Sequence, residues 1–164
     1  MKKVLIIAAS NGHNLKLANT FKDKYSELEA QAEVVDLAAL ELPLYSPVAE
    51  GNGVPTQLND LLVKLDDADA LAVIAPEYNG GVPPTLTNFI AWTSRSSDDW
   101  RKYFNGKSTA IASFSGSGGV NVLNSMRVQL SYLGANVVGR HVQAHFKMPV
   151  KDEDVDAVAR LSLK

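Results

Sequence analysis

The chain has 164 residues, a length typical of one domain with a single core, so we expect residues 1–164 to form one unit. Lys and Arg number 16 against 18 Asp and Glu, and this near-neutral balance gives no electrostatic footprint for nucleic acid or an anionic membrane. No cysteine is present, which excludes disulfides and thiolate chemistry, and no apolar run is long enough to cross a bilayer, so we expect a cytoplasmic protein.

Short apolar runs alternate with longer helical patterns along the chain. The runs predict five strands, at residues 4–9, 32–36, 70–75, 108–114 and 136–142. Apolar residues at helical spacing predict helices near 15–28, 58–65, 84–94, 122–133 and, in the acidic tail, 155–161. A proline-punctuated connection is expected at 42–47.

This alternation predicts an α/β fold, a three-layer α/β/α sandwich around a five-stranded parallel sheet. In such sheets, ligands bind outside the carboxyl ends of the strands. Three loops at those ends are rich in Gly, Ser and Asn, at 10–14, 76–81 and 115–119. Together they indicate one shared site.

The first loop contains Ser10, His13 and Asn14 between a strand and a helix. A hydroxyl, an amide and the N–H groups of a helix start suit a phosphate. The spacing is neither that of a P-loop nor G-x-G-x-x-G. The alternative is a plain turn in which Ser10 or Asn14 caps the helix.

The second loop is the most informative stretch, Pro76, Glu77, Tyr78, Asn79 and Gly80. A tight loop with Tyr, Asn and Gly allows backbone amides to approach a flat heterocycle, and its prolines make it rigid. The alternative is a connection whose Tyr packs on the edge of the sheet.

The third loop contains Ser115, Gly116, Ser117 and Gly119, between the fourth strand and a helix. Its place at the carboxyl edge of the sheet favours ligand contact, and the alternative is a flexible glycine turn. No G-x-S-x-G elbow accompanies these serines, so a hydrolase lacks support. His141 and His145 are four residues apart, but they lie on a predicted strand and its exit and not on a helix, which argues against a metal site. We predict no catalytic side chain and no metal ligand.

Two blocks of the sequence resemble a known family. The stretch from Pro76 to Trp92 is similar to the P-E-Y-N-x-x-x-P-x-x-L-K-N-x-I-D-W signature of the NADPH-dependent FMN reductases, which are flavodoxin-like proteins that include quinone, azo-dye and chromate reductases. Ser115, Gly116, Gly119 and Arg127 match the second block. The resemblance covers nearly the whole chain, but His13 stands near an expected Arg, and the first loop is shorter than usual.

The resemblance implies FMN and NAD(P)H as cofactors. By resemblance, the phosphate is held by Ser10, His13 and Asn14. The ribityl chain and one ring edge are lined by Pro76, Glu77, Tyr78, Asn79 and Gly80, and the ring is flanked by Ser115, Gly116, Ser117 and Gly119. The implied reaction passes hydride from the nicotinamide to flavin N5 and then electrons to a small acceptor, such as a flavin or quinone.

Two other functions remain open on the sequence, a flavodoxin-type electron carrier and a flavin-binding protein without turnover. The resemblance also implies a homodimer or a dimer of dimers, with candidate contacts around 42–45 and 92–100. The choice between NADH and NADPH is open, and Arg95, Arg101 and Lys102 are candidates for a 2′-phosphate pocket.

Overall fold

A computed structural model describes residues 1–164. At its centre lies a parallel sheet in the order β2-β1-β3-β4-β5, with β6 also beside β4. This is the doubly wound order of flavodoxin-like folds. The strands are Lys3–Ala8 (β1), Gln31–Asp36 (β2), Ala70–Ile74 (β3), Ser108–Phe114 (β4), Asn136–Val137 (β5) and Val142–Ala144 (β6). The predicted α/β class is confirmed.

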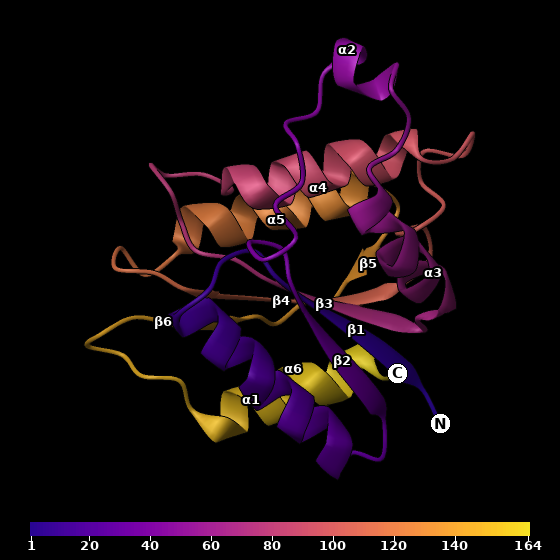
Figure 1. Cartoon of the computed structure of the whole chain (residues 1–164). Coiled ribbons are helices and arrows are strands. Elements are labelled where there is room, and N and C mark those ends of the chain that lie inside the picture. The colour runs from indigo at the N-terminus through magenta and orange to yellow at the C-terminus, as the bar shows by residue number, and fades with distance from the viewer.

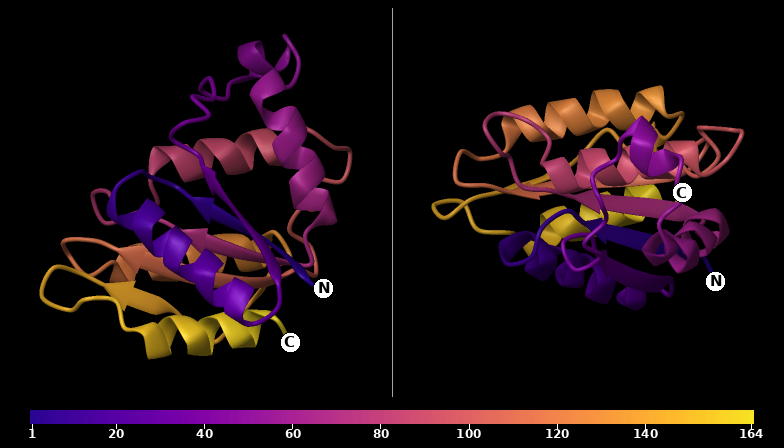
Figure 2. Two further views of the ribbon diagram at one scale, coloured as in Figure 1. Left: turned by 60° about the horizontal axis from the view of Figure 1, so that its bottom comes forward. Right: turned by 45° about the horizontal axis from the view of Figure 1, so that its top comes forward.

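Helices cover both faces of the sheet, and this arrangement confirms the three layers (Figures 1 and 2). None of them is long and apolar enough to cross a membrane. The helices are His13–Glu27 (α1), Pro47–Glu50 (α2), Asn59–Asp67 (α3), Pro84–Arg95 (α4), Val120–Tyr132 (α5) and Asp152–Ser162 (α6), and a 3₁₀ turn, Thr56–Leu58, precedes α3. Helix α6 extends the predicted tail helix at both ends.

Alternation along the strands divides the core into two clusters. Leu5 and Ile7 of β1 face a cluster shared with α3, α4 and α5, whereas Ile6 faces the cluster shared with α1 and α6. On the α1 and α6 side, β3 and β4 present mainly alanines, so that the large rings of Phe21 and Tyr25 can pack closely against the sheet. Both faces of the central strands are buried, as their continuous apolar runs predict.

The predicted fifth strand, 136–142, is wrong as a single strand. Between Thr109 and Ala112, strand β4 advances three residues, whereas its neighbour advances five, from Val137 to Val142. The extra residues leave the ladder and divide the edge into β5 and β6. The guanidinium of Arg127 binds the segment between β5 and β6, where it donates to the carbonyl of Val138 at 2.8 Å.

The segment that carries α2 projects from the body and lies along α4 (Figure 1). One stripe of α4, Asn88, Trp92 and Arg95, holds it in place. Asn88 Nδ2 and Trp92 Nε1 donate to the carbonyl of Pro43 at 3.0 and 2.7 Å. Arg95 pairs with Glu50 at 2.7 Å. The segment is therefore a fixed part of the surface, although the sequence predicts only a connection there.

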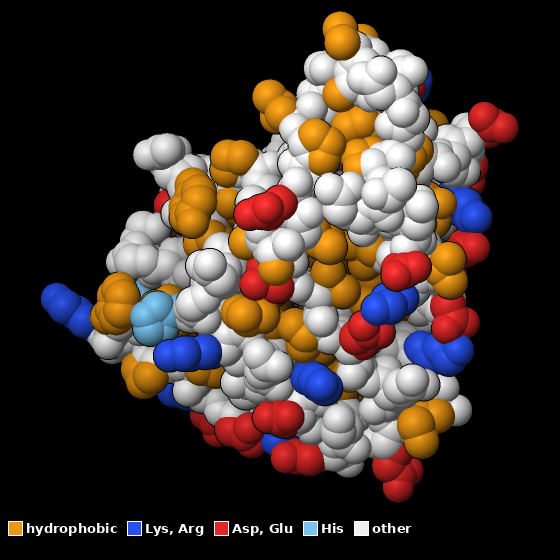
Figure 3. Space-filling view, viewed as in Figure 1, with side chains coloured by type: hydrophobic (Ala, Val, Ile, Leu, Met, Phe, Trp, Pro, Cys, Tyr) orange, Lys and Arg blue, Asp and Glu red, His pale blue; other side chains and the backbone are white.

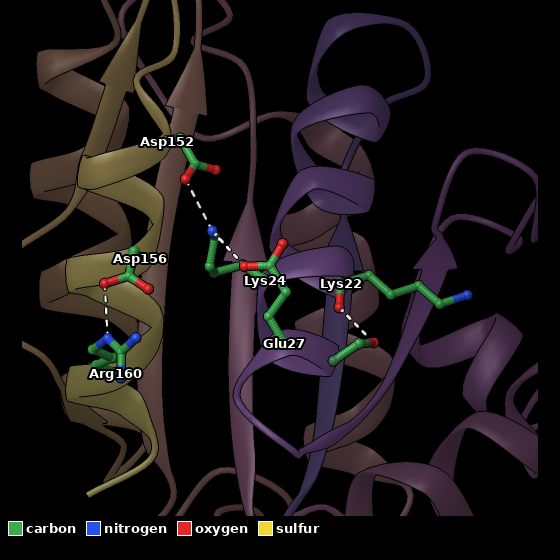
Figure 4. Close-up of polar contacts among 7 residues, drawn as sticks. Lys22, Lys24, Glu27, Asp152, Asp156 and Arg160 are labelled. Carbon is green, nitrogen blue, oxygen red and sulfur yellow. Dashed lines mark hydrogen bonds and ion pairs between the residues drawn. The ribbon is translucent and has the colours of Figure 1, made fainter.

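Helix α6 is joined to α1 by polar contacts at two consecutive residues. Figure 4 shows the Lys24 ammonium between the carboxylates of Glu27 and Asp152, at 2.7 and 2.9 Å. These hydrogen bonds, first that from Glu27, raise the pKa of Lys24. Next to it, the buried hydroxyls of Tyr25 and Ser162 lie 2.7 Å apart.

Alkaline pH tests the buried end of this contact. Burial raises the pKa of Tyr25 to about 12, and the hydrogen bond with Ser162 opposes this only in part. The unfolded state therefore loses the phenol proton first, so stability falls as pH rises above about 10. Between pH 9 and 11, the wild type should lose about 1.3 kcal/mol more unfolding free energy than Tyr25→Phe, as measured by urea denaturation. Equal losses in both proteins would contradict the assignment.

Candidate functional site

Parallel pairing brings the carboxyl ends of β1, β3, β4 and β6 to one edge of the sheet, on the left of Figure 1. The chain continues from β1 into α1 on one face, and from β3 into α4 on the other face. The two connections diverge between neighbouring strands, and folds of this order bind ligands at such a switch point. All three predicted loops lie at this edge.

The start of α1 is an open anion site. Its N-cap is Gly12, at φ 76°, with no side-chain cap and no acidic residue in the first turn. The first N–H groups of the helix therefore have no partner within the chain, and they carry the positive end of its dipole. The alternative in which Ser10 or Asn14 caps this helix is wrong.

Asn14 is a brace between the first and third loops. Its Nδ2 donates to the carbonyl of Phe114 at 2.9 Å, and its Oδ1 accepts from the N–H of Phe114 at 2.9 Å. The residue is only 3% exposed. One N–H and the oxygen of this amide are therefore bonded to Phe114, so the side chain of Asn14 connects the two loops.

His13 is exposed at the start of α1 and belongs to an aromatic cluster. Its ring stacks on Phe114, with centroids 4.4 Å apart and planes 13° apart. Phe146, which is 74% exposed, meets His13 edge-on at 5.4 Å. Neither phenylalanine is predicted as part of the site from the sequence, although Phe114 ends β4 and Phe146 follows β6, both at the carboxyl edge.

The second loop ends in a two-residue hairpin. The N–H of Tyr78 donates to the carbonyl of Gly81 at 3.1 Å, and the N–H of Gly81 donates to the carbonyl of Tyr78 at 3.0 Å. Asn79 and Gly80 between them have φ of 51° and 77°, the positive values of a type I′ turn, for which Asn-Gly is the preferred pair. Tyr78 is 51% exposed, so it does not pack into the sheet edge as the alternative required.

Glu77, by contrast, points into the protein framework. Its carboxylate accepts from the hydroxyl of Ser117 at 2.9 Å and from the N–H groups of Asn121 and Val122 at 3.0 and 3.3 Å. Partial desolvation acts to raise the pKa of Glu77, but the hydrogen bonds from Ser117, Val122 and Asn121 outweigh it and hold that pKa below its ordinary value. The carboxylate thus caps the first N–H groups of α5.

The third loop is braced rather than flexible. Ser115 is 5% exposed, and its Oγ accepts from the N–H of Glu77 at 2.7 Å and lies 2.8 Å from Ser113 Oγ. Gly119 has φ 73°, and a Cβ there would lie 2.5 Å from Ser113 Oγ. The chain can pass this point only without a side chain.

The structure divides the predicted residues into two groups. Those exposed at the edge are His13, Tyr78, Asn79, Gly80, Gly116 and Ser117, with Ser10 and Glu77 half-buried. Those buried beneath it are Asn14, Pro76, Ser115 and Gly119. The exposed residues and Ser10 can touch a ligand, whereas Glu77, with its carboxylate bound to the third loop and α5, holds the loops in place together with the buried group.

The residues present fit a flat ligand with an anionic end. The loops lead into α1, α4 and α5. At the start of α5, the Glu77 carboxylate already accepts from the N–H groups, and α4 begins with Pro83 and Pro84, which have no N–H. Helix α1 offers the unpaired N–H groups of its first turn with no carboxylate or proline among them, which suits a phosphate. No group of three His, Asp or Glu that could hold a metal is present.

The basic residues proposed for a 2′-phosphate do not belong to this edge. Arg95 ends α4, and Arg101 and Lys102 lie between α4 and the start of β4. That connection runs along the amino edge of the sheet. The guanidinium of Arg101 instead lies 4.4 Å from the ring centre of Trp100. Within one chain, these three candidates therefore lie away from the three loops.

Comparisons with known proteins agree with this geometry. The NADPH-dependent FMN reductase family matches residues 2–148 of the chain. An NADPH azoreductase of Bacillus sp. (strain OY1-2) is 32% identical over 150 residues, which cover 87% of this chain and 75% of the relative. An uncharacterized protein of Mycoplasma pneumoniae is 30% identical over 141 residues, with 83% and 82% covered. The solved structure of FerB, a flavoenzyme NAD(P)H:(acceptor) oxidoreductase from Paracoccus denitrificans, has a TM-score of 0.79 at 21% identity, covering 99% of this chain and 98% of FerB.

Two glycines of the third loop give a matched test of its rigidity. Gly119→Ala places a methyl group against Ser113 at positive φ, and we expect it to cost more than about 2 kcal/mol of unfolding free energy. At Gly116 a Cβ meets nothing within 4 Å, so Gly116→Ala should change stability by less than about 0.5 kcal/mol. Urea denaturation of both variants measures the difference, and similar losses would show that the loop is not braced as described.

Proposed function

The chain belongs to the NADPH-dependent FMN reductase family, and we propose that the carboxyl edge of its sheet is where electrons pass from NAD(P)H to a small-molecule acceptor. The protein is an NAD(P)H-dependent oxidoreductase that uses FMN. The observation that carries the proposed site is the uncapped start of α1, which shares one edge with the half-exposed hairpin at 78–81. Residues 1–164 would act as one FMN-binding domain.

The phosphate end of the cofactor would bind at α1. The N–H groups of His13 and Asn14 lie at the positive end of the helix, and Ser10 and the His13 ring add side-chain donors from the same turn. No carboxylate in the first turn of α1 opposes an anion there. Each dipole or charge interaction of this kind contributes about 0.3–1 kcal/mol, so several donors together are needed.

The ring end would lie between the hairpin and the third loop. The N–H groups of Asn79 and Gly80 have no acceptor within the chain, because the hairpin bonds use only Tyr78 and Gly81. Such fixed donors stabilise negative charge that develops on a ring edge. The N–H groups of Asn79 and Gly80 would hold the ring edge of FMN, and bound FMN would supply the redox chemistry, hydride acceptance from NAD(P)H and transfer of two electrons to the acceptor.

The acceptor is proposed to be a flat aromatic compound such as a quinone, an azo compound or a free flavin. Three large apolar side chains are exposed around the edge: Tyr78 and Val120 at 51% each and Phe146 at 74%. They provide apolar contact without a charged group that would select one substrate. The relative named as an azoreductase supports this class of acceptor.

A homodimer is proposed on the outer faces of α4 and α5. A groove between these helices is lined only by uncharged side chains, namely Val82, Thr87, Asn124, Ser125, Val128 and Gln129. Beside it, the projecting segment exposes Leu44 at 79% and Val48 at 81%, and Figure 3 shows hydrophobic side chains gathered on that projection. Trp92, expected among the contacts, is only 1% exposed and contributes to the core instead.

Flavin binding and reduction test the proposed function. Titration with FMN should give a perturbed flavin absorbance band that bleaches when NADPH or NADH is added without oxygen. The double variant Tyr78→Ala/Asn79→Ala should remain folded and bind FMN at least about tenfold more weakly, because about 1.4 kcal/mol of ring contact is lost.

Val63→Ala, on the exposed face of α3, is the control for these substitutions and should bind FMN as the wild type does. A bound flavin that stays oxidised with both nucleotides would instead identify an electron carrier or a binding protein. Absence of flavin binding would overturn the proposed site.

The dimer proposal is tested by charge placed in the groove. Val128→Glu, at a position 73% exposed, should convert a dimer into a monomer, because the buried carboxylate would find no basic partner there. Val63→Glu, at 70% exposure on α3, is the matched control and should leave the oligomeric state unchanged. Sedimentation velocity measures both, and a dimer that survives Val128→Glu would place the interface elsewhere.

A further inference from the structure

We propose that Glu77 is a positioning residue that fixes the hairpin at 78–81 against the third loop, and so sets the width of the space for the flavin ring. This inference rests on the proposed function. It replaces the expectation that Glu77 lines the cofactor, because its carboxylate is directed at the protein itself.

Both oxygens of the Glu77 carboxylate are bound by the start of α5. Oε1 accepts from Ser117 Oγ at 2.9 Å and from Asn121 Nδ2 at 3.3 Å. Oε2 accepts from the N–H groups of Asn121 and Val122 at 3.0 and 3.3 Å. The N-cap of this helix is Gly119, which offers no side chain. Glu77 therefore supplies from a distant loop the cap that helices usually take from their own N-cap residue.

The main chain of Glu77 is fixed to the same loop. Its N–H donates to Ser115 Oγ at 2.7 Å, and Ser115 is itself held by Ser113 Oγ at 2.8 Å. The residue thus has two separate attachments, one through its backbone and one through its side chain. With both in place, the peptide that enters the Tyr78–Gly81 hairpin cannot rotate relative to the third loop.

The charge of Glu77 strengthens this attachment. A carboxylate at a helix start interacts favourably with the helix dipole, and hydrogen bonds to a charged acceptor are about twice as strong as neutral ones. A neutral amide of the same size keeps one acceptor oxygen but turns its NH₂ group toward N–H donors. Glu77→Gln therefore tests the attachment with little change in volume.

The experiment compares flavin affinities of purified full-length variants. Glu77→Gln should weaken binding of both FMN and riboflavin by about tenfold, because the affected contact is at the ring end, whereas His13→Ala should weaken FMN only. Amide hydrogen exchange should show faster exchange at Asn121 and Val122, and also at the hairpin amides of Tyr78 and Gly81. The control is Glu33→Gln, whose carboxylate binds Lys64 on the exposed side of β2.

A double-mutant cycle tests whether Glu77 acts through its bond with Ser117. Ser117→Ala removes one donor and should weaken riboflavin binding by about threefold, and adding it to Glu77→Gln should cause no further loss. This milder variant serves as well if Glu77→Gln does not fold. A wild type that binds flavin, with unchanged affinity in Glu77→Gln and Ser117→Ala, would overturn the proposal for Glu77 alone. If the wild type binds no flavin, the proposed function fails, and unchanged hairpin exchange in Glu77→Gln would then reject the positioning role independently.

Discussion

The common direction and register of the central strands is the constraint on which the candidate site depends. Ala8 of β1 pairs with Ile74 of β3, which pairs with Ala112 of β4, so the three strands end at nearly the same level. Their loops must therefore emerge side by side. Two long-range bonds then connect them: Asn14 joins the first loop to the third, and Glu77 joins the second to the third. Thr85 Oγ donates to Ala9 O and joins the second connection to the first. Because every pair of loops is tied, the edge is shaped before any ligand arrives, and binding requires little ordering of the chain.

The helices α1, α4 and α5, which follow the three loops, differ in the groups at their first turns, and this difference favours one of them as an anion site. Helix α5 already has a carboxylate from Glu77, and α4 begins with two prolines that lack N–H groups. Helix α1 begins with glycine and has no acidic residue in its first turn. Of these three positions, the start of α1 is therefore the one that we propose for a phosphate, because the start of α5 holds a carboxylate and that of α4 has fewer N–H groups.

The parts of this structure that the sequence predicts are those determined by local pattern. Strand β4 has the predicted bounds, Ser108–Phe114, because its apolar run ends abruptly at polar residues. The Asn79–Gly80 turn likewise follows from its own two residues. The divided edge strand was not predicted, because the guanidinium that binds it comes from another helix, and the residue pattern of 136–142 is that of an ordinary strand. The roles of Asn14 and Glu77 were also beyond the sequence, since their partners lie 100 and about 40 residues away.

The use of Glu77 as an internal cap also bears on the chemistry that the edge can perform. It is the one acidic residue of the three loops, and its carboxylate is bound by donors of the third loop and α5. The side chains left facing outward are a histidine, a tyrosine, an asparagine and a serine, with the N–H groups of Asn79 and Gly80. Such a surface can bind, orient and stabilise negative charge, but it has no carboxylate available as a base. The same residue that we propose to make the edge rigid thus has its negative charge bound within the protein, and the proposed chemistry needs only a cofactor held by the remaining groups.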